Sequence, residues 1–332
     1  MIHSSSYVLT SKGLRRAGDI RDAEVVTFDE KGVSLTLITE PRPLYREGNL
    51  LTLVTSDGHE LLCSGLIKIK TPFGFIAGTD LAAGDRVSLQ PREGNFGEAS
   101  LLHNDCETGL ILGLLARGTV SAKDTLALFG TSSFIDPEEA RAAVASLTAL
   151  SGPVELFEKN IDQIGGSKLF YWLADYVSHP ELILDQVIEP VMSGSIEATL
   201  CYLAALFADP DLKAERLGEQ ISVYSLKTHT FARQVQLLLL NHGILSSVHG
   251  KVVYMDMKSF SSLIGKIARY GRTFSYSDKL WAMLDPFFNQ QRAFFSTVRS
   301  VKTSQMSSAP DSSGIYAISS QPYIANGLIV QE

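Results

Sequence analysis

Residues 50–70 read LLTLVTSDGHELLCSGLIKIK, two apolar runs separated by a polar segment that contains Asp57 and Gly58. Short apolar runs bounded by turn residues predict β-strands joined by tight turns. Runs of the same kind, each ended by Gly, Asp-Gly or Pro, fill the rest of residues 1–97. The sequence therefore predicts an all-β N-terminal region.

The spacing of apolar residues changes between about residues 100 and 290. Helical spacing is found in GLILGLLARG (109–118), SIEATLCYLAALF (195–207) and TFARQVQLLLLNHGIL (230–245). Strand-like segments lie between the later helices, and strand character returns in IYAIS (315–319) and PYIANGLIVQE (322–332). The order of β, then α with β, then β predicts an α+β protein in which one domain is inserted into another.

The length and composition favour a protein that folds without disulfides or a membrane. A chain of 332 residues with 45% hydrophobic content can form two domains with buried cores. Cys63, Cys106 and Cys201 are widely separated and odd in number, which argues against a disulfide framework. No apolar run approaches the roughly 20 residues that cross a bilayer, and the N-terminus lacks the pattern of a signal peptide. We expect a cytoplasmic protein that does not bind membranes.

The charge is acidic overall but unevenly distributed. The net charge of −7 opposes general affinity for nucleic acid, since phosphate binding needs many Lys and Arg side chains. Residues 251–302 hold nine Lys and Arg against three Asp, a net of +6, so the remaining residues carry −13. Only one face of the protein could therefore bind DNA.

Three blocks resemble the conserved blocks of an intein, a protein-splicing domain of the Hint type. YVLTSKGLRRAGDI (7–20) is similar to the opening block, and residues 56–87 are similar to the second block, with its Leu-x-x-Gly-Asp-x-Val strand. IYAISSQPYIANGLIVQE (315–332) resembles the closing blocks, which contain an Asn-Gly turn. The blocks occur in the family's order and span both ends of the chain.

The resemblance implies that the residues needed for splicing have been replaced. Met1 stands where the family has a nucleophilic Cys or Ser, Ser64 replaces the Thr of the second block, and Ile67 replaces its His. A thioether cannot carry out an acyl shift, and an aliphatic side chain cannot donate a proton. We also expect no substrate for splicing, because the sequence has no residue before Met1.

The resemblance implies that the splicing residues of the closing blocks have also been replaced. Ala317 stands for an Asp, Gln321 for a His, and Gln331 with Glu332 for the terminal His-Asn pair. Cyclisation needs a carboxamide with a downstream peptide, and Glu332 offers neither. We therefore expect no splicing activity, no cofactor and no small-molecule substrate.

The region between these blocks resembles a LAGLIDADG homing endonuclease. Similar segments are GLILGLLARGTVSAKDTLALFG (109–130), SGSIEATLCYLAALFADPDL (193–212) and SVYSLKTHTFARQVQLLLLNHGILSSV (222–248). In that family an acid at the end of each of two helices holds a divalent metal at the scissile phosphates. Arg117 occupies the first position, and Pro210 falls at the second beside Asp209. The resemblance thus implies a degenerate nuclease site without metal.

The family resemblance predicts how the chain is divided. Residues 1–97 and 303–332 should form an all-β Hint-like horseshoe domain, and its two chain ends should meet. Residues 98–302 should form a pseudo-two-fold αββαββ domain of the LAGLIDADG type. Its helices near 108–117 and 196–207 should cross closely.

Three functional interpretations remain open. The first is a non-enzymatic interaction or assembly subunit with a protein partner, encoded by a phage or mobile element in a bacterial or archaeal cell. The second is a protein that binds duplex DNA without cutting it, in transcription or repression, with phosphate contacts from Lys266, Arg269, Arg272 and Lys279. The third, a residual homing endonuclease, is disfavoured by Arg117 and Pro210.

Overall fold

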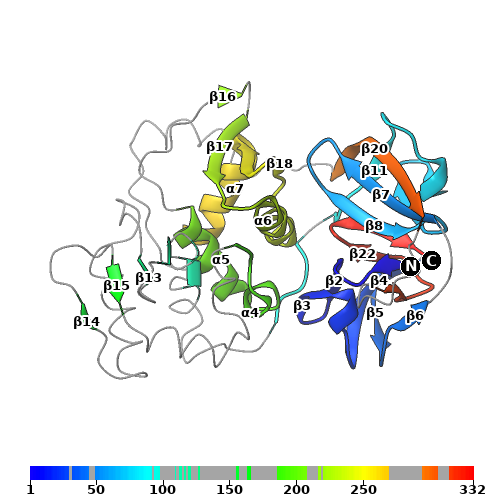
Figure 1. Cartoon of the computed structure of the whole chain (residues 1–332), viewed down its shortest axis with the longest axis horizontal. Coiled ribbons are helices and arrows are strands. Elements are labelled where there is room, and N and C mark those ends of the chain that lie inside the picture. The colour runs from blue at the N-terminus through cyan, green and yellow to red at the C-terminus, as the bar shows by residue number, and fades with distance from the viewer. Residues whose placement is uncertain are drawn as a thin grey trace. The chain divides into compact units, whose positions relative to one another are not determined.

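The computed structural model describes residues 1–29, 32–44, 49–91, 93–97, 185–207, 220–268, 294–305 and 314–332. It also describes residues 109, 112, 113, 116, 119–120, 126–127, 155–156, 163–165 and 216–217. Strands dominate both ends of the chain, and helical residues occur between 109 and 268 (Figure 1). The predicted α+β class, with a mostly β N-terminal region, is confirmed.

The first and last parts of the chain form two β-sheets together. One sheet has the order β11-β20-β7-β8-β1-β21-β6, and the other has the order β10-β9-β23-β22-β2-β4-β5, with β3 paired to β2. Each sheet contains strands from both ends of the chain, with C-terminal strands lying between N-terminal ones, so neither end could form these sheets without the other. The strands are β1 (Ile2–His3), β2 (Tyr7–Thr10), β3 (Gly13–Arg16), β4 (Ala23–Asp29), β5 (Gly32–Ile38), β6 (Arg42–Leu44), β7 (Asn49–Thr55), β8 (Glu60–Ser64), β9 (Lys68–Thr71), β10 (Gly74–Ala77), β11 (Arg86–Ser88), β20 (Phe295–Gln305), β21 (Ile315–Ala317), β22 (Tyr323–Ala325) and β23 (Leu328–Gln331).

The two sheets share one hydrophobic core. Because side chains alternate across a strand, the residues of one face become buried together. Burial of aliphatic side chains supplies most of the stabilisation, roughly 1.5–3 kcal/mol for each large residue. Fully buried members include Ile2, Val8, Leu51, Leu53, Leu61, Ile67, Ile69, Val87, Leu328 and Val330.

The middle of the chain contributes helices and two small sheets. The sheets have corresponding strand orders, β12-β13-β15-β14 and β16-β17-β19-β18. Their strands are β12 (Thr119–Val120), β13 (Leu126–Ala127), β14 (Glu155–Leu156), β15 (Gln163–Gly165), β16 (Arg216–Leu217), β17 (Gln220–Ser225), β18 (Ser247–His249) and β19 (Val252–Asp256). The helices are α4 (Glu189–Met192), α5 (Ile196–Leu206), α6 (His229–Asn241) and α7 (Met257–Ala268).

Helix α5 begins and packs as its sequence predicts. The Ser195 hydroxyl accepts a hydrogen bond from the Ala198 N–H at 3.1 Å, a standard N-terminal cap. The helical residues Gly109 and Gly113 lie against α5, where an added Cβ would collide with the carbonyl oxygens of Ala198 and Tyr202 respectively. The predicted close crossing of two helices is therefore present, and it depends on glycine.

Contacts group the chain into two compact units. One comprises residues 1–97, 236–249 and 291–332, called the β unit below, and the other comprises 98–235 and 250–290. Strand β20 hydrogen-bonds along β7, from Val298 opposite Thr55 to Gln305 opposite Asn49. Residues 295–302, which the sequence-based boundary placed in the inserted domain, thus lie in a sheet of the β unit.

Residues 236–249 are also an integral part of the β unit. The Gln236 side-chain amide donates to the carbonyl oxygens of Asp57 at 2.6 Å and Ser246 at 3.0 Å. The Asn241 amide donates to the Asn95 carbonyl oxygen at 2.9 Å. Leu240 is buried in the hydrophobic core of the sheets. A segment from the middle of the chain therefore completes the β unit.

Two further observations concern the predictions on membranes and cysteines. Among the described residues, no helix is long and apolar enough to span a bilayer.

Cys201, buried in α5, takes part in a disulfide bond, which the odd count and wide spacing of cysteines did not predict. Cys63 is a free cysteine in the core. Wide separation in sequence was a poor guide because folding brings distant residues together.

Candidate functional site

Met1 directly precedes β1, which lies between two strands of the β unit. Ile2 lies opposite Cys63 of β8 on one side and opposite Tyr316 of β21 on the other. The Met1 carbonyl oxygen accepts a hydrogen bond from the Ser64 N–H at 3.0 Å. Met1 is thereby fixed beside Ser64.

The last strand is fixed by a tight turn at Asn326 and Gly327. Both residues have positive φ, 47° and 81°, which suits the two-residue turn of a β-hairpin. The Asn326 side-chain oxygen accepts from the Tyr7 N–H at 2.7 Å, and its amide donates to the Glu60 carbonyl oxygen at 2.8 Å. The hairpin β22–β23 is thus tied to β2 and β8, and β23 carries Glu332 to Met1.

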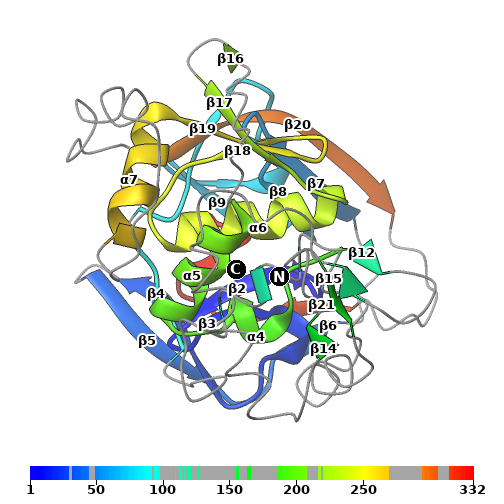
Figure 2. The same cartoon turned by 90° about the vertical axis from the view of Figure 1, so that its left-hand side faces the viewer.

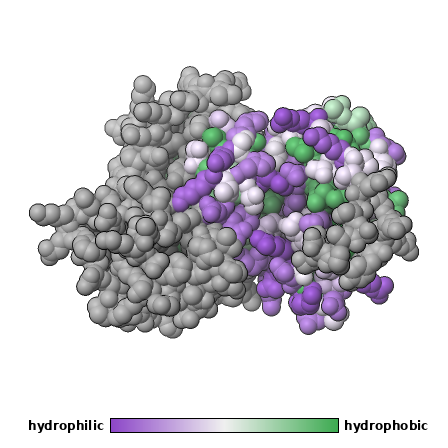
Figure 3. Space-filling view, in the orientation of Figure 1, coloured by the Kyte–Doolittle hydropathy of each residue, from purple (hydrophilic) through white to green (hydrophobic). Residues whose placement is uncertain are grey.

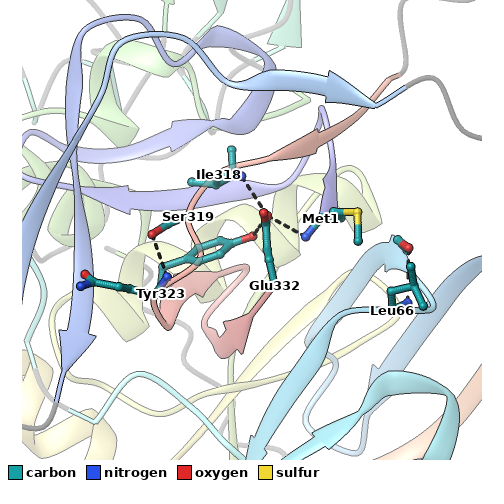
Figure 4. Close-up of polar contacts among 8 residues, drawn as sticks. Met1, Leu66, Ile318, Ser319, Tyr323 and Glu332 are labelled. Atoms are coloured by element: carbon teal, nitrogen blue, oxygen red, sulfur yellow. Dashed lines mark hydrogen bonds and ion pairs between the residues drawn. The ribbon is translucent and has the colours of Figure 1, made fainter.

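The Glu332 carboxylate is the centre of a polar cluster (Figure 4). Its Oε1 accepts from the Met1 amine at 2.7 Å, the Ile318 N–H at 2.8 Å and the Tyr323 hydroxyl at 2.9 Å. The exposed fractions of the Met1 and Glu332 side chains are only 21% and 12%. A carboxylate in such a place needs hydrogen-bond donors, and three converge on one of its oxygens.

Burial and charge shift the pKa values of the groups around Glu332. Burial lowers the pKa of the Met1 amine, and the negative charge of Glu332 opposes this effect. Burial raises the pKa of the Tyr323 hydroxyl, and the charge of Glu332 and the hydrogen bond to it act in the same direction. Tyr323 therefore remains a neutral hydrogen-bond donor at physiological pH.

Cys63 is close to Met1 but is not a reactive nucleophile. Its side chain is fully buried, and its Sγ donates weakly to the Leu51 carbonyl oxygen at 3.7 Å. Burial raises the pKa of the Cys63 thiol to about 12, although the positive charge of the Met1 amine acts against the rise. Because the thiolate is the nucleophilic form, this cysteine is inert near neutral pH.

Ser64 and Ile67 are the residues that the block resemblance matched to the Thr and His of the intein family. The Ser64 hydroxyl accepts from the Leu66 N–H at 3.3 Å, and the Ser64 carbonyl oxygen accepts from the Ile67 N–H at 3.1 Å. The Ile67 side chain is fully buried in the core, and its carbonyl oxygen accepts from the Gly78 N–H at 2.7 Å. Ile67 thus stabilises the fold and cannot exchange a proton.

The two glutamines of the closing block make contacts elsewhere. The Gln321 side-chain oxygen accepts from the Thr36 hydroxyl at 3.2 Å, and the Gln331 amide donates to the Ser320 carbonyl oxygen at 3.4 Å. Of the predicted positions, the structure brings together Met1, Ser64 and Glu332. Sequence reasoning missed Tyr323 and Cys63, although Tyr323 lies in the closing block and Cys63 directly precedes Ser64.

Most of the predicted nuclease and DNA positions lie outside the described residues, namely Arg117, Asp209, Pro210, Arg269, Arg272 and Lys279. Lys266 is described, and it lies half-buried in the last turn of α7. No group of three or more His, Cys, Asp and Glu side chains within the described ranges could hold a metal ion. The predicted DNA-binding residues therefore remain a prediction.

Neither a protein-family model nor a curated protein matches the sequence. Among solved structures, the chain is similar to part of the Ssp DnaB mini-intein variant M86 and of its G-1F mutant. Each shows 16% identity, a TM-score of 0.25 and coverage of 28% of this chain and 61% of the other. The MchDnaB-1 intein matches at 19% identity with a TM-score of 0.22, over 26% of this chain and 66% of that one. The chain thus spans about three fifths of the mini-inteins it matches.

Proposed function

We propose that this chain is an intein-derived protein with a LAGLIDADG-like insertion, inactive in splicing and in cleavage, that acts as an interaction or assembly subunit. The observation that carries the proposal is the set of contacts at Glu332. Its carboxylate accepts from the Met1 amine, the Tyr323 hydroxyl and the Ile318 N–H. The proposal matches Met1 to the nucleophile and Glu332 to the cyclising amide of an intein, and the contacts of the Glu332 carboxylate support a structural role for it.

The chemistry of the individual residues supports loss of splicing. An acyl shift needs a hydroxyl or thiolate at the first position, and Met1 has an inert thioether. Cys63, the nearest thiol, stays protonated because its pKa is about 12. Protonation of the leaving amide needs a group such as His, and Ile67 is an aliphatic core residue.

An interaction role would account for a protein that keeps its fold after losing splicing and DNA cleavage. The net charge of −7 favours a protein partner over general binding to nucleic acid. A phage or mobile-element assembly is the context that we propose, since inteins and homing endonucleases are themselves mobile elements.

Affinity capture of the tagged full chain from its native source tests this proposal. We expect the same protein partner to be recovered with and without nuclease treatment, because a direct protein contact does not depend on a nucleic-acid tether. Loss of every partner after nuclease treatment would contradict the assembly role and favour binding to DNA.

Binding of duplex DNA without cleavage is the second candidate, and the basic segment 251–302 favours it. That segment carries a net charge of +6, and Lys266 lies in its described part. The close crossing of α5 with the helical residues Gly109 and Gly113 is compatible with a LAGLIDADG-like saddle. Residual nuclease activity is a less favoured form of this candidate, because Arg117 and Pro210 stand at the metal-binding positions.

A titration of labelled duplex DNA at two salt concentrations, with magnesium present, tests the second candidate. If Lys266, Arg269 and Arg272 contact phosphates, losing one of them should reduce the slope of log affinity against log salt by about 1. A triple alanine variant that binds as tightly as the wild type would exclude this face. A cut product would overturn the assignment of a dead nuclease site.

A further inference from the structure

Strand β5 exposes a row of apolar side chains. Val33, Leu35 and Leu37 are 45%, 48% and 65% exposed, and they lie on one face of the strand. Only two other large hydrophobic residues are exposed in the described part of the chain, Leu66 and Phe73, each in a separate turn. On the face seen in Figure 3, the described surface is mostly hydrophilic, with small separate hydrophobic patches. The row on β5 is therefore a distinct feature of the β unit.

The opposite face of β5 is already used inside the β unit. The Thr27 hydroxyl of β4 lies 2.9 Å from the Ser34 hydroxyl and 3.0 Å from the Thr36 hydroxyl. Thr36 also donates to Gln321 at 3.2 Å. Since the polar face is occupied, the apolar face is the one available to a partner.

Strand β5 ends its sheet. It pairs with β4 on one side, and no strand within the described residues pairs with its other side (Figure 2). Its register with β4 is unbroken from Ala23 opposite Ile38 to Asp29 opposite Gly32, so no bulge distorts the strand. The outer side of β5 is thus a long, regular edge.

The hydrogen bonds of β4 show which backbone groups of β5 point outward. The Phe28 N–H donates to the Pro322 carbonyl oxygen at 2.8 Å, and the Glu24 carbonyl oxygen accepts from the Ser11 N–H at 2.7 Å. Both groups thus point away from β5. In an antiparallel ladder, the residues opposite such positions also direct their backbone groups away from the shared side.

These opposite residues are the ones with exposed side chains. Val33 lies opposite Phe28, Leu35 opposite Val26, and Leu37 opposite Glu24. The N–H and C=O groups of Val33, Leu35 and Leu37 therefore face outward along the edge. The same three residues offer both hydrogen bonds and apolar surface to a partner.

The edge also lacks the usual protection against pairing. Natural edge strands carry Lys, Pro, inward charges or bulges that prevent association. The sequence Gly32–Ile38, GVSLTLI, contains neither a charged residue nor a proline, although the chain carries a net charge of −7. We propose that β5 binds β5 of a second copy of this chain, antiparallel and about a two-fold axis at Leu35.

This strand is complementary to itself in the proposed register. Leu35 lies opposite Leu35 of the second copy, and Val33 lies opposite Leu37 of the second copy, so all apolar side chains meet on one face. The outward N–H and C=O groups pair reciprocally, and no like charges oppose one another. A two-fold contact of this kind uses the same surface on both copies and closes, which gives a dimer and not a fibre.

This dimer rests on the proposed assembly function. It adds to that function one binding surface, strand β5, and one partner, a second copy of the chain. A single paired strand buries less than the roughly 800 Å² per partner found in stable complexes. We therefore expect a weak dimer, with a dissociation constant on the order of 10 µM.

Sedimentation velocity of the full chain tests the dimer over a range of about 1 to 200 µM, which brackets that constant. The sedimentation coefficient of the wild type should rise with concentration toward the value for a dimer. Leu35→Lys places like charges opposite each other at the axis, and it should weaken dimerisation by at least about tenfold. The matched control is Leu66→Lys, the same change at a residue that is 70% exposed in a turn, and it should dimerise like the wild type.

Hydrogen–deuterium exchange of the wild type gives a readout that needs no variant. The outward amides of Val33, Leu35 and Leu37 should exchange more slowly at high protein concentration. A wild type that is monomeric throughout, a Leu35→Lys variant that dimerises normally, or equal loss in Leu66→Lys would overturn the proposal. Recovery of a different protein partner from the native source by a monomeric chain would leave the assembly function intact while rejecting this surface.

Discussion

At the scale of single residues, Glu332 is the centre of a polar cluster that stabilises the β unit. One carboxylate oxygen accepts three hydrogen bonds, from the Met1 amine, the Ile318 N–H and the Tyr323 hydroxyl. A buried charge is stabilised only while its partners remain, so each contact depends on the others. The cluster joins Met1 and Glu332 through an ion pair between the Met1 amine and the Glu332 carboxylate.

Removing the charge of Glu332 should destabilise the fold. We expect Glu332→Gln to lower the free energy of unfolding by about 1.5–3 kcal/mol, because it weakens charge-assisted hydrogen bonds without changing the side-chain size. Tyr323→Phe removes one donor and should cost about 1 kcal/mol. Urea titrations of both variants and the double variant measure the coupling, and strictly additive losses would argue against a shared cluster.

Cys63 should make the protein sensitive to alkaline pH. Its pKa is 9.0 in an unperturbed thiol and about 12 in the fold, so the folded state holds the proton more tightly. The stabilisation is complete below pH 9.0 and is lost as the pH rises toward 12. At about pH 10.5 we expect a loss of about 2 kcal/mol relative to pH 8.

Cys63→Ala separates this effect from other titrating groups. The raised pKa of Tyr323 destabilises the fold in the same direction at high pH, so the measured quantity is the difference between wild type and variant. The urea midpoint of Cys63→Ala should fall less between the two pH values than that of the wild type. Equal falls would mean that the Cys63 thiol does not carry the effect.

At the scale of elements, the crossing of two helices depends on the missing side chain of Gly113. An added Cβ would meet the Tyr202 carbonyl oxygen and lie 2.7 Å from the Ala205 Cβ. Gly to Ala within a helix ordinarily stabilises it by about 1 kcal/mol. Here we expect Gly113→Ala to destabilise the protein by about 1–3 kcal/mol, because backbone atoms of α5 must move.

Thermal unfolding followed by circular dichroism measures the effect of Gly113→Ala. The matched control is Ser262→Ala, which changes an exposed position of α7 and should leave the midpoint nearly unchanged. A midpoint for Gly113→Ala at or above that of the wild type would show that the helices do not pack as described.

Local patterns predicted some elements and could not predict others. The apolar alternation around 50–70 identified β7 and β8, and the helical spacing at 195–207 identified α5. Strand β20 pairs with β7, about 250 residues away, and residues 236–249 complete the β unit from within a helical segment. Neither relation leaves a local signal, because the partners are distant in sequence.

The candidate site divides in the same way. The block resemblance named Met1, Ser64 and Glu332, which the structure brings together, and their replacement of splicing residues stays a prediction. The role of Tyr323 depends on the hairpin turn at Asn326, which brings β22 and β23 together so that the Tyr323 hydroxyl reaches Glu332. The protonation state of the Cys63 thiol depends on its burial. These properties come from packing, which a single sequence does not display.

At the scale of the whole molecule, loss of splicing can be tested without knowing any partner. Short peptides fused before Met1 and after Glu332 would supply the scissile bonds that a splicing domain requires. We expect intact mass spectra between about pH 6 and 9, the range in which imidazole and ordinary thiol groups titrate. The physical reason is that the first position offers a thioether, the nearest thiol is protonated, and Ile67 stands in place of a proton donor.

A protease site placed in each fused peptide verifies that a cleaved product would be detected. A fusion before Met1 also converts its amine into an amide, which removes the positive charge beside Glu332 and should lower the unfolding midpoint of the fused chain. A fusion after Glu332 alone leaves that ion pair available and should be less costly. A product cut at either junction, lost on changing Met1 or Glu332 to Ala, would show that the site retains chemistry and would reject its structural role.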